Sequence, residues 1–269
     1  KGIPTEIRFF NEETAIELSE KGKADLIIAN NVMAHVPDIN SFASGIAALL
    51  KEGGTATIEF QYAVDLLTKN AFDMIYHEHF SYLSLHAMDS IMKSSGLFIY
   101  DVEKLGTQGG SIRIYVSARA SRHPKTSNLA RLLAEERAMG IDNPSTYRTF
   151  AENANRKRQQ ARDYLRDIKR AGKTIACYGA AAKGSTFLNY VGVDDRLVDY
   201  VVDRNKEKQG HYMAGSRLKV HPPEHLSITK PDYVWILPWN IRDEIVSEQG
   251  IVRSWGGKFL VMMPEIEVI

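Results

Sequence analysis

Short apolar runs alternate with amphipathic helical patterns along most of this chain, and this alternation restricts the possible folds more than any other feature. Residues 24–30 (ADLIIAN) are an apolar run that ends in a polar residue, and residues 12–20 before them have a helical pattern. A second helical pattern at residues 39–50 leads through a turn at residues 51–54 to a strand at residues 55–60. Buried strands that alternate with helices are typical of a parallel α/β sheet.

The same sheet gains further predicted strands before and after these elements. Residues 5–10 have a short alternating pattern and predict a first strand. A helix is expected at residues 87–95, followed by strands at residues 97–103 and 111–118. The glycine-containing turn at residues 106–110 joins the last two strands into a hairpin, which would complete the sheet with antiparallel strands.

The composition changes after residue 118, and the chain is then expected to be helical, with a break at residues 140–144. Further β-type runs, interleaved with helical segments, predict a second α/β unit. These runs are residues 174–178, 198–203, 233–237 and 259–263, with helical segments at 185–190 and 242–247. The expected organisation is part of a Rossmann-like sheet at residues 1–118, a helical connection at 119–172 and a second Rossmann-like α/β domain at 173–269.

The helical connection carries a basic stretch that could bind phosphate. Its cations are Arg156, Lys157, Arg158, Arg162, Arg166, Lys169 and Arg170. Apolar side chains form a stripe along the same segment, at Phe150, Ala154, Ala161, Leu165 and Ile168. We therefore favour the interpretation that the cations are the solvated back of an amphipathic helix over the interpretation that they bind a phosphate group.

The charge balance and the cysteine content argue against several classes of function. Lys and Arg together number 34 and Asp and Glu 33, so the net charge of +1 argues against a nucleic-acid-binding surface that depends on bulk charge. Apolar runs are too short to cross a membrane, and the single cysteine, Cys177, can form no internal disulfide and cannot by itself hold zinc. We expect a cytoplasmic protein that acts on a small molecule. Its oligomeric state is left open.

Two segments carry the side chains best suited to chemistry. Asn30, Asn31 and His35 lie at the carboxyl end of a predicted strand, where open α/β sheets bind ligands. The second segment is Tyr76-His77-Glu78-His79-Phe80-Ser81-Tyr82-Leu83-Ser84-Leu85. Its imidazoles and phenols supply a base near neutral pH and hydrogen-bond donors for an oxyanion.

Two other interpretations of the second segment stay open. His77 and His79 have the spacing of a metal-binding pair, with Glu78 or His35 as a further ligand. No regular helical spacing presents a third ligand, so we expect no metal site. The segment could also be a purely structural surface loop.

A third segment joins a predicted strand to a predicted helix. It is Tyr178-Gly179-Ala180-Ala181-Ala182-Lys183-Gly184-Ser185. Backbone amides and Lys183 could contact a diphosphate there, and Asp203 ends the next strand where a ribose-binding acid could lie. The glycine order is that of neither a dinucleotide-binding nor a nucleotide-hydrolysing loop, so a structural turn is an equal interpretation.

Several of these motifs occur together, and in this order, in one known family. They are Tyr76-His77-Glu78-His79 with Tyr82 and Ser84-Leu85, Gly109-Gly110-Ser111-Ile112-Arg113-Ile114-Tyr115, the run from Tyr178 to Gly184, Lys208-Gln209-Gly210, and Leu237-Pro238-Trp239-Asn240-Ile241. Over essentially its whole length the chain resembles the C-methyltransferases that act on nucleotide-linked keto-sugars. The strand that ends at Asn30 also resembles the fourth strand of class I S-adenosylmethionine-dependent methyltransferases.

The resemblance implies a reaction and a role for each matching residue. S-adenosylmethionine would donate a methyl group to the carbon next to the ketone of a nucleoside-diphosphate keto-deoxysugar. His79 would remove the proton from that carbon, Tyr76 would hydrogen-bond near the keto oxygen, and Glu78 would orient the pocket. The implied cofactor contacts are Asn30, Asn31 and His35, the last also a pocket residue. The implied substrate contacts are Gly109, Gly110, Ser111, Arg113, Gly179, Lys183, Trp239 and Asn240.

The chain also departs from the family. An N-terminal cysteine-rich zinc module and a glycine-rich cofactor loop are usual there and are missing here, and the first residues, KGIP, are no initiator methionine or signal peptide. We therefore expect a segment upstream, and expect residues 1–269 alone to bind S-adenosylmethionine poorly. Gln108 replaces a usual histidine and Leu83 a common aromatic residue, which leaves the exact substrate open. The alternatives are an NAD-linked oxidoreductase that uses residues 178–184 and a non-catalytic sugar-nucleotide-binding fragment.

Overall fold

A computed structural model describes residues 2–118 and 123–269 and divides the chain into two compact units. The first unit comprises residues up to 65 and residues 77–146, and the second comprises residues 66–76 and 147–269. The chain therefore passes between the units three times. The predicted start of the helical connection, at residue 119, lies outside the described residues, and the predicted domain boundaries stay a prediction.

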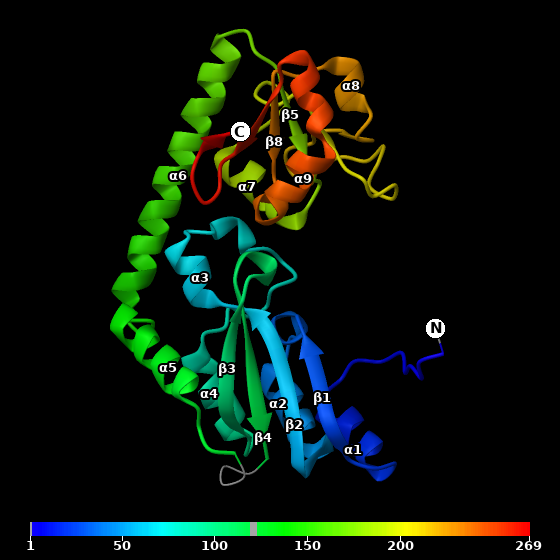
Figure 1. The fold of residues 1–269 in the computed structure, drawn as a ribbon, viewed down its shortest axis with the longest axis vertical. Helices are drawn as coiled ribbons and strands as arrows, with labels where there is room; N and C mark the ends of the chain where they lie inside the picture. Colours follow the sequence, from blue (N-terminus) through cyan, green and yellow to red (C-terminus); the bar gives the residue numbers. More distant parts are fainter. Residues whose placement is uncertain (1, 119–122) are drawn as a thin grey trace. The chain divides into compact units, whose positions relative to one another are not determined.

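Within the described part of the first unit, four strands form one sheet in the order β1-β2-β4-β3 (Figure 1). The strands are β1 (Ala24–Asn30), β2 (Leu50–Gln61), β3 (Phe98–Leu105) and β4 (Ser111–Ser117). β1 and β2 are parallel, whereas β4 is antiparallel to both of its neighbours. The predicted sheet with its final antiparallel hairpin is confirmed. The predicted turn at residues 51–54 is wrong, because β2 begins at Leu50 and runs through it.

Helices α2 (Ile39–Leu49), α4 (Leu85–Ser94) and α5 (Ser127–Met139) of the first unit pack against one face of this sheet, and α1 (Glu12–Glu20) packs against α2. The unit also has the short 3-10 turns η1 (Met33–His35) and η3 (Thr107–Gly109). Ile46 of α2, Met88 of α4 and Leu132 of α5 share one buried cluster with Ile58 and Ile114 of the sheet. Side chains alternate along a strand, so the intervening residues face the other side, where Leu26 and Ile28 of β1 are exposed. Helix α3 (Ala63–Thr68) lies where the chain first passes between the units.

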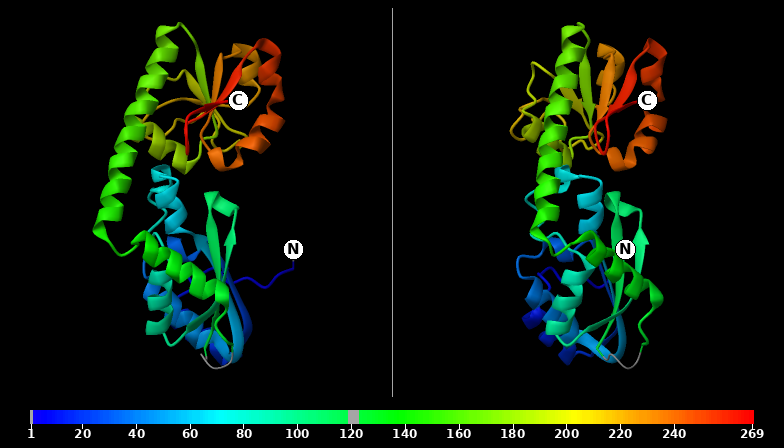
Figure 2. Two further views of the ribbon diagram at one scale, coloured as in Figure 1. Left: turned by 60° about the vertical axis from the view of Figure 1, so that its left-hand side comes forward. Right: turned by 90° about the vertical axis from the view of Figure 1, so that its left-hand side faces the viewer.

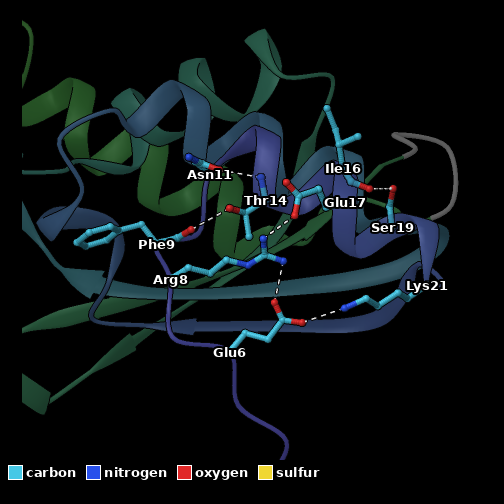
Figure 3. Close-up of polar contacts among 9 residues, drawn as sticks. All are labelled: Glu6, Arg8, Phe9, Asn11, Thr14, Ile16, Glu17, Ser19 and Lys21. Carbon is cyan, nitrogen blue, oxygen red and sulfur yellow. Dashed lines mark hydrogen bonds and ion pairs between the residues drawn. The ribbon is translucent and has the colours of Figure 1, made fainter.

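Residues 5–10 are not the strand that the sequence predicts. They form an irregular and largely exposed arm, and ion pairs hold this arm against α1 (Figure 3). Arg8 lies 2.7 Å from Glu6 and 2.5 Å from Glu17, and the ammonium of Lys21 lies 3.1 Å from Glu6. A strand needs a hydrogen-bonded neighbour, and among the described residues none pairs with this arm. Ion pairs to the helix replace the sheet contacts.

In residues 147–269, all of which are described, six strands form a sheet in the order β10-β9-β8-β5-β6-β7. They are β5 (Ile175–Tyr178), β6 (Tyr200–Val202), β7 (Val220–His221), β8 (Tyr233–Ile236), β9 (Lys258–Val261) and β10 (Glu267–Val268). The five strands β9, β8, β5, β6 and β7 are parallel to one another, and β10 pairs antiparallel with β9 at the edge of the sheet. Ile175 and Cys177 enter one core, and Ala176 and Tyr178 enter another, so the sheet is buried on both faces.

Helices cover both faces of the second sheet (Figure 2). They are α6 (Pro144–Arg170), α7 (Ala182–Val191), α8 (His225–Thr229) and α9 (Arg242–Glu248), with 3-10 turns η2 (Phe72–Met74), η4 (Trp239–Ile241) and η5 (Gly250–Trp255). Leu165 of α6 and Phe187 of α7 belong to one core, whereas Leu226 of α8 and Ile245 of α9 belong to the other. This is a doubly wound α/β arrangement, as predicted.

Candidate functional site

The carboxyl end of β1 positions the first candidate side chains. Asn30 ends the strand opposite Glu59 of β2, and Asn31 follows with a φ of 54°, in the left-handed region that asparagine tolerates. The backbone N–H of Asn31 donates to the Glu59 carbonyl at 2.8 Å. The turn η1 then ends at His35. Two carboxamides and an imidazole therefore follow a parallel strand at the edge where such sheets bind ligands.

The structure brings His35 and His79 together from distant parts of the sequence. Nδ1 of His35 lies 2.7 Å from the carbonyl oxygen of Glu78, which is 43 residues further along the chain. The centres of the His35 and His79 rings are 4.9 Å apart. The backbone N–H of Phe80 donates to the Ala34 carbonyl at 2.8 Å. Backbone contacts on both sides of His79 therefore hold it beside His35.

These contacts distinguish the histidines of the motif. A carbonyl oxygen can only accept, so Nδ1 of a neutral His35 carries the proton and Nε2 is its basic nitrogen. The ring of Tyr82 meets His79 edge-on, with centres 5.9 Å apart. His79 is half-buried between two rings, whereas the side chains of His77 and Glu78 are exposed. Of the two motif histidines, His79 is the one in an enclosed position.

The glycine run before β4 forms a structural corner. Gly110 has a φ of 135°, and a Cβ atom there would lie 1.9 Å from Oδ2 of Asp65. Ser111 is buried, and its hydroxyl donates to the Thr107 carbonyl at 3.1 Å. Gly109 also has a positive φ, of 84°. These residues shape the hairpin turn, and their predicted contact with a substrate stays a prediction.

Arg113 lies in a network of charges on the sheet face opposite the helices. Its guanidinium donates to Glu59 at 2.7 Å and to Glu103 at 2.8 Å. Thr107 donates to the second oxygen of Glu59 at 3.0 Å. The hydroxyl of Tyr115 donates to Glu103 at 2.8 Å, and this bond raises the pKa of Tyr115. Arg113 therefore has two carboxylate partners within the sheet, and its predicted role in substrate binding stays a prediction.

In the second unit the strand order reverses at β5, because the chain adds β6 and β7 on one side and β8 on the other. Open α/β sheets bind ligands beyond the carboxyl ends of the strands at such a point. Gly179 follows β5 with a φ of 93°, and a Cβ atom on it would lie 2.6 Å from the ring of Pro238 after β8. The two strand ends therefore pack directly against each other.

Residues 66–76 of the chain pack at this reversal point. The indole Nε1 of Trp239 donates to Oδ2 of Asp73 at 2.8 Å. Phe72 stacks on Phe187 of α7, with ring centres 5.3 Å apart. A segment of the second unit itself thus covers the strand ends that the sequence suggested for a ligand.

Asp73 is the centre of a buried polar cluster that contains the predicted contacts Lys183, Trp239 and Asn240. The ammonium of Lys183 donates to Asn240 at 2.5 Å and lies 5.3 Å from the centre of the Trp239 ring. Burial raises the pKa of Asp73 from 3.8 to about 6, against the opposing effects of the Trp239 hydrogen bond and the charge of Lys183. Burial lowers the pKa of Lys183, and Asp73 opposes that change. The structure therefore gathers three predicted contacts around one buried acid.

Asp73 is the residue of this cluster that sequence reasoning missed. It lies between Phe72 and Met74, and it is only 1% exposed. An acid inside an apolar run is a signal for a buried polar partner, since an unpaired buried charge is costly. Because Tyr76 follows three residues later, half-buried, the cluster anchors the chain immediately before this candidate.

The turn after β5 uses its polar groups for its own structure. The N–H of Gly179 donates to the Val202 carbonyl at 2.8 Å, and the N–H of Ala180 donates to Asp203 at 2.7 Å. The ammonium of Lys208 donates to the Ala180 carbonyl, also at 2.7 Å. Asp203 thus caps the turn, which favours the structural interpretation of this segment over a dinucleotide-binding loop.

Two absences within residues 2–118 and 123–269 add to this description. No helix in these ranges is long and apolar enough to cross a membrane. Nor do three or more His, Cys, Asp or Glu side chains gather there in a way that could hold a metal ion.

Comparisons with known proteins match both units. A family model described as "C-methyltransferase C-terminal domain" matches residues 106–264, and one described as "Methyltransferase domain" matches residues 4–102. C-methyltransferase NovU of Streptomyces niveus is 37% identical over 270 residues, which cover 100% of this chain and 64% of that protein. The chain therefore spans about two thirds of the length of this relative.

Among solved structures, one similar chain comes from the complex between the Haloferax volcanii Trm112 methyltransferase activator and a methyltransferase. The match covers 42% of this chain and 57% of that chain, at 12% identity and a TM-score of 0.32. We base no conclusion on a likeness of this size.

Proposed function

Since this chain belongs to the C-methyltransferase family, we propose that it takes part in methyl transfer to the carbon next to the ketone of a nucleoside-diphosphate keto-deoxysugar. The observation that carries the proposal is the pair of neighbouring rings, His35 and His79, beside the carboxyl end of β1. Carbon methylation needs a base, because the proton next to a ketone must leave before the carbon can form a new bond. An imidazole is the side chain best suited to this at neutral pH.

We propose His79 as that base. Its ring takes the proton from the carbon, and the electron pair of the broken C–H bond moves into an enolate. The enolate carbon would then form the bond to the methyl group, and the electron pair of the methyl–sulfur bond would leave with the sulfur of the donor. A hydroxyl that donates to the keto oxygen lowers the barrier, because negative charge develops on that oxygen as the proton leaves and is absent in the bound ketone. We assign that donor to Tyr76, and the orientation of the pocket to Glu78.

S-adenosylmethionine, when bound, supplies an electrophilic methyl group attached to a sulfonium. The residues proposed to contact it are Asn30, Asn31 and His35. Their chemistry fits, because carboxamides and a neutral imidazole can both donate to and accept from the polar groups of an adenosyl cofactor. They also follow β1 at the ligand-binding edge of a parallel pair of strands.

The replacement His79→Asn tests the base. In the intact protein we expect methyl transfer to fall by roughly a hundredfold or more. A second measurement needs no methyl donor: the exchange of the proton next to the ketone for deuterium in D₂O, followed by NMR. This exchange should slow to a similar degree, whereas binding of the sugar nucleotide should change little.

His77→Asn is the matched control, because His77 belongs to the same motif and is exposed. It should leave both rates near those of the wild type. If His79→Asn exchanges the proton at the normal rate, His79 is not the base. If His35→Asn alone abolishes exchange, the base is His35.

A further inference from the structure

A cleft of about 500 Å³ lies in the second unit, where the end of α3, the first half of α6 and the loop after β9 meet. This volume is typical of small-molecule sites. The polar groups that line it include three cations and three carboxamides: Lys69, Arg156, Lys157, Asn70, Asn153 and Gln160. Such a lining favours a polar and anionic ligand over an apolar one.

Lys157 is the most enclosed cation of this cleft. The sequence favours a solvated position for it, and that interpretation is wrong for this residue, which is only 6% exposed. Its ammonium donates to the Pro264 carbonyl and lies 2.9 Å from Glu265. An ammonium has three N–H groups, so these contacts leave one for a further acceptor. The Glu265 side chain is 84% exposed, and water therefore screens much of its charge.

Asn70 supplies a second and independent observation. It follows α3 with a φ of 51° and lines the cleft. Both polar atoms of its side-chain amide are buried, and neither makes a hydrogen bond. Buried polar groups are nearly always paired with protein, water or a ligand. The amide of Asn70 is therefore an unpaired donor and acceptor at the wall of the cleft, and a bound molecule can satisfy it when the side chain turns toward the cleft.

We propose that this cleft binds a diphosphate group. Lys69, Arg156 and Lys157 against Glu265 give the lining a net charge of +2, and a guanidinium can bind a phosphate through two parallel hydrogen bonds. The cleft is also larger than a single phosphate needs. The group can belong to inorganic diphosphate or to a nucleoside diphosphate. For inorganic diphosphate the proposal goes beyond the methyl-transfer reaction, and for a nucleoside diphosphate it rests on the proposed substrate. Its test measures binding to the cleft, so it can fail while methyl transfer stands.

Isothermal titration calorimetry of the purified chain with inorganic diphosphate and with UDP tests the proposal. Asn70→Asp keeps the size of the side chain and adds a negative charge, so it should weaken binding by about tenfold or more. Arg156→Gln changes an exposed side chain and should weaken it by about threefold or more. The matched control is Arg166→Gln, also on α6, whose partner is Asp163 and which does not line the cleft. It should leave the affinity unchanged.

Each outcome decides the question. Tighter binding of UDP than of inorganic diphosphate, lost in the two cleft variants, identifies a nucleotide as the ligand. Equal affinities that fall in the same two variants identify the diphosphate group alone. Absence of binding by either probe, or binding that Asn70→Asp and Arg156→Gln leave unchanged, overturns the proposal. Circular dichroism checks that each variant is folded. If Asn70→Asp does not fold, Arg156→Gln alone still tests the proposal.

Discussion

Replacing the buried acid by its neutral isostere, Asp73→Asn, should stabilise the second unit in a manner that depends on pH. The carboxylate of Asp73 is buried beside Trp239 and Lys183, and burial raises its pKa from 3.8 to about 6. Asparagine has nearly the same shape and can still accept the hydrogen bond from Trp239. The replacement therefore removes the charge and leaves the packing in place.

The size of the effect follows from the change in pKa. One pKa unit corresponds to 1.36 kcal/mol, so a change from 3.8 to about 6 makes the ionised form of Asp73 costly by roughly 3 kcal/mol. Because the pKa is higher in the folded state, the contribution of Asp73 to stability is complete below pH 3.8 and is lost as the pH rises through about 6. In the variant Lys183 also loses the opposite charge that faces it. We therefore expect Asp73→Asn to be more stable than the wild type by roughly 1–3 kcal/mol at pH 8, and equally stable near pH 4.

Denaturant unfolding followed by tryptophan fluorescence measures this difference, because all three tryptophans, Trp235, Trp239 and Trp255, lie in the second unit. Asp232→Asn is a control that should change the unfolding free energy in the opposite direction. Hydrogen bonds from Lys173 and Thr174 hold the pKa of Asp232 below its usual value. Its replacement should destabilise the protein at pH 7, and the loss should shrink as the pH falls through the lowered pKa.

Two results would refute this reasoning about Asp73. One is a difference in unfolding free energy between Asp73→Asn and the wild type that is the same at pH 4.5 and pH 8. The other is an Asp73→Asn protein that is less stable than the wild type at pH 8. Either would mean that the carboxylate gains more from its partners than burial costs it.

Three further replacements test other parts of the structure. Tyr76→Phe should lower kcat more than it weakens substrate binding if the hydroxyl stabilises an enolate, and an unchanged kcat with weaker binding would make Tyr76 a binding residue only. Gly110→Ala should destabilise the first unit by roughly 2 kcal/mol or more, because its Cβ would collide with Asp65 at a φ of 135°. Backbone amides of β4 that exchange with solvent as slowly in Gly110→Ala as in the wild type would contradict this. Glu136→Gln should lower the free energy of unfolding by roughly 1–2 kcal/mol, because it replaces a buried carboxylate that accepts from the Leu85 N–H at 2.7 Å by a neutral amide. Thermal unfolding measures the effect, and an unchanged Tm would show that the charge is not needed.

Local patterns predict most elements of this fold well. The helix at residues 12–20 and the strand at residues 24–30 occur with the predicted bounds, because apolar spacing and the capping Asn11 specify them within a few residues. The predictions of a strand at residues 5–10 and of a turn at residues 51–54 are wrong because local spacing does not determine strand pairing. Whether a segment becomes a strand depends on a neighbour to pair with, and the local sequence does not contain that neighbour.

The candidate site depends on contacts that no local pattern contains. The motif from Tyr76 to His79 can be recognised by its side chains, but the approach of His35 to His79 is set by tertiary packing. Lys183 and Trp239 were expected to contact a substrate, and their contact with Asp73 could not be predicted because 166 residues separate Asp73 from Trp239. Spacing along the sequence has no bearing on so distant a pair.

That separation has a consequence for how the chain is made. Residues 66–76 leave the ribosome well before the partner of Asp73, which is synthesised 166 residues later. At about 5–20 residues per second, the segment waits roughly 10–30 s for Trp239. During that time residues 77–146 can complete the first unit, while Phe72 and Met74 stay without their final packing partners. The second unit can therefore complete its packing around Asp73 only after Trp239 has been synthesised, and until then the apolar residues of the 66–76 segment are open to binding by a chaperone.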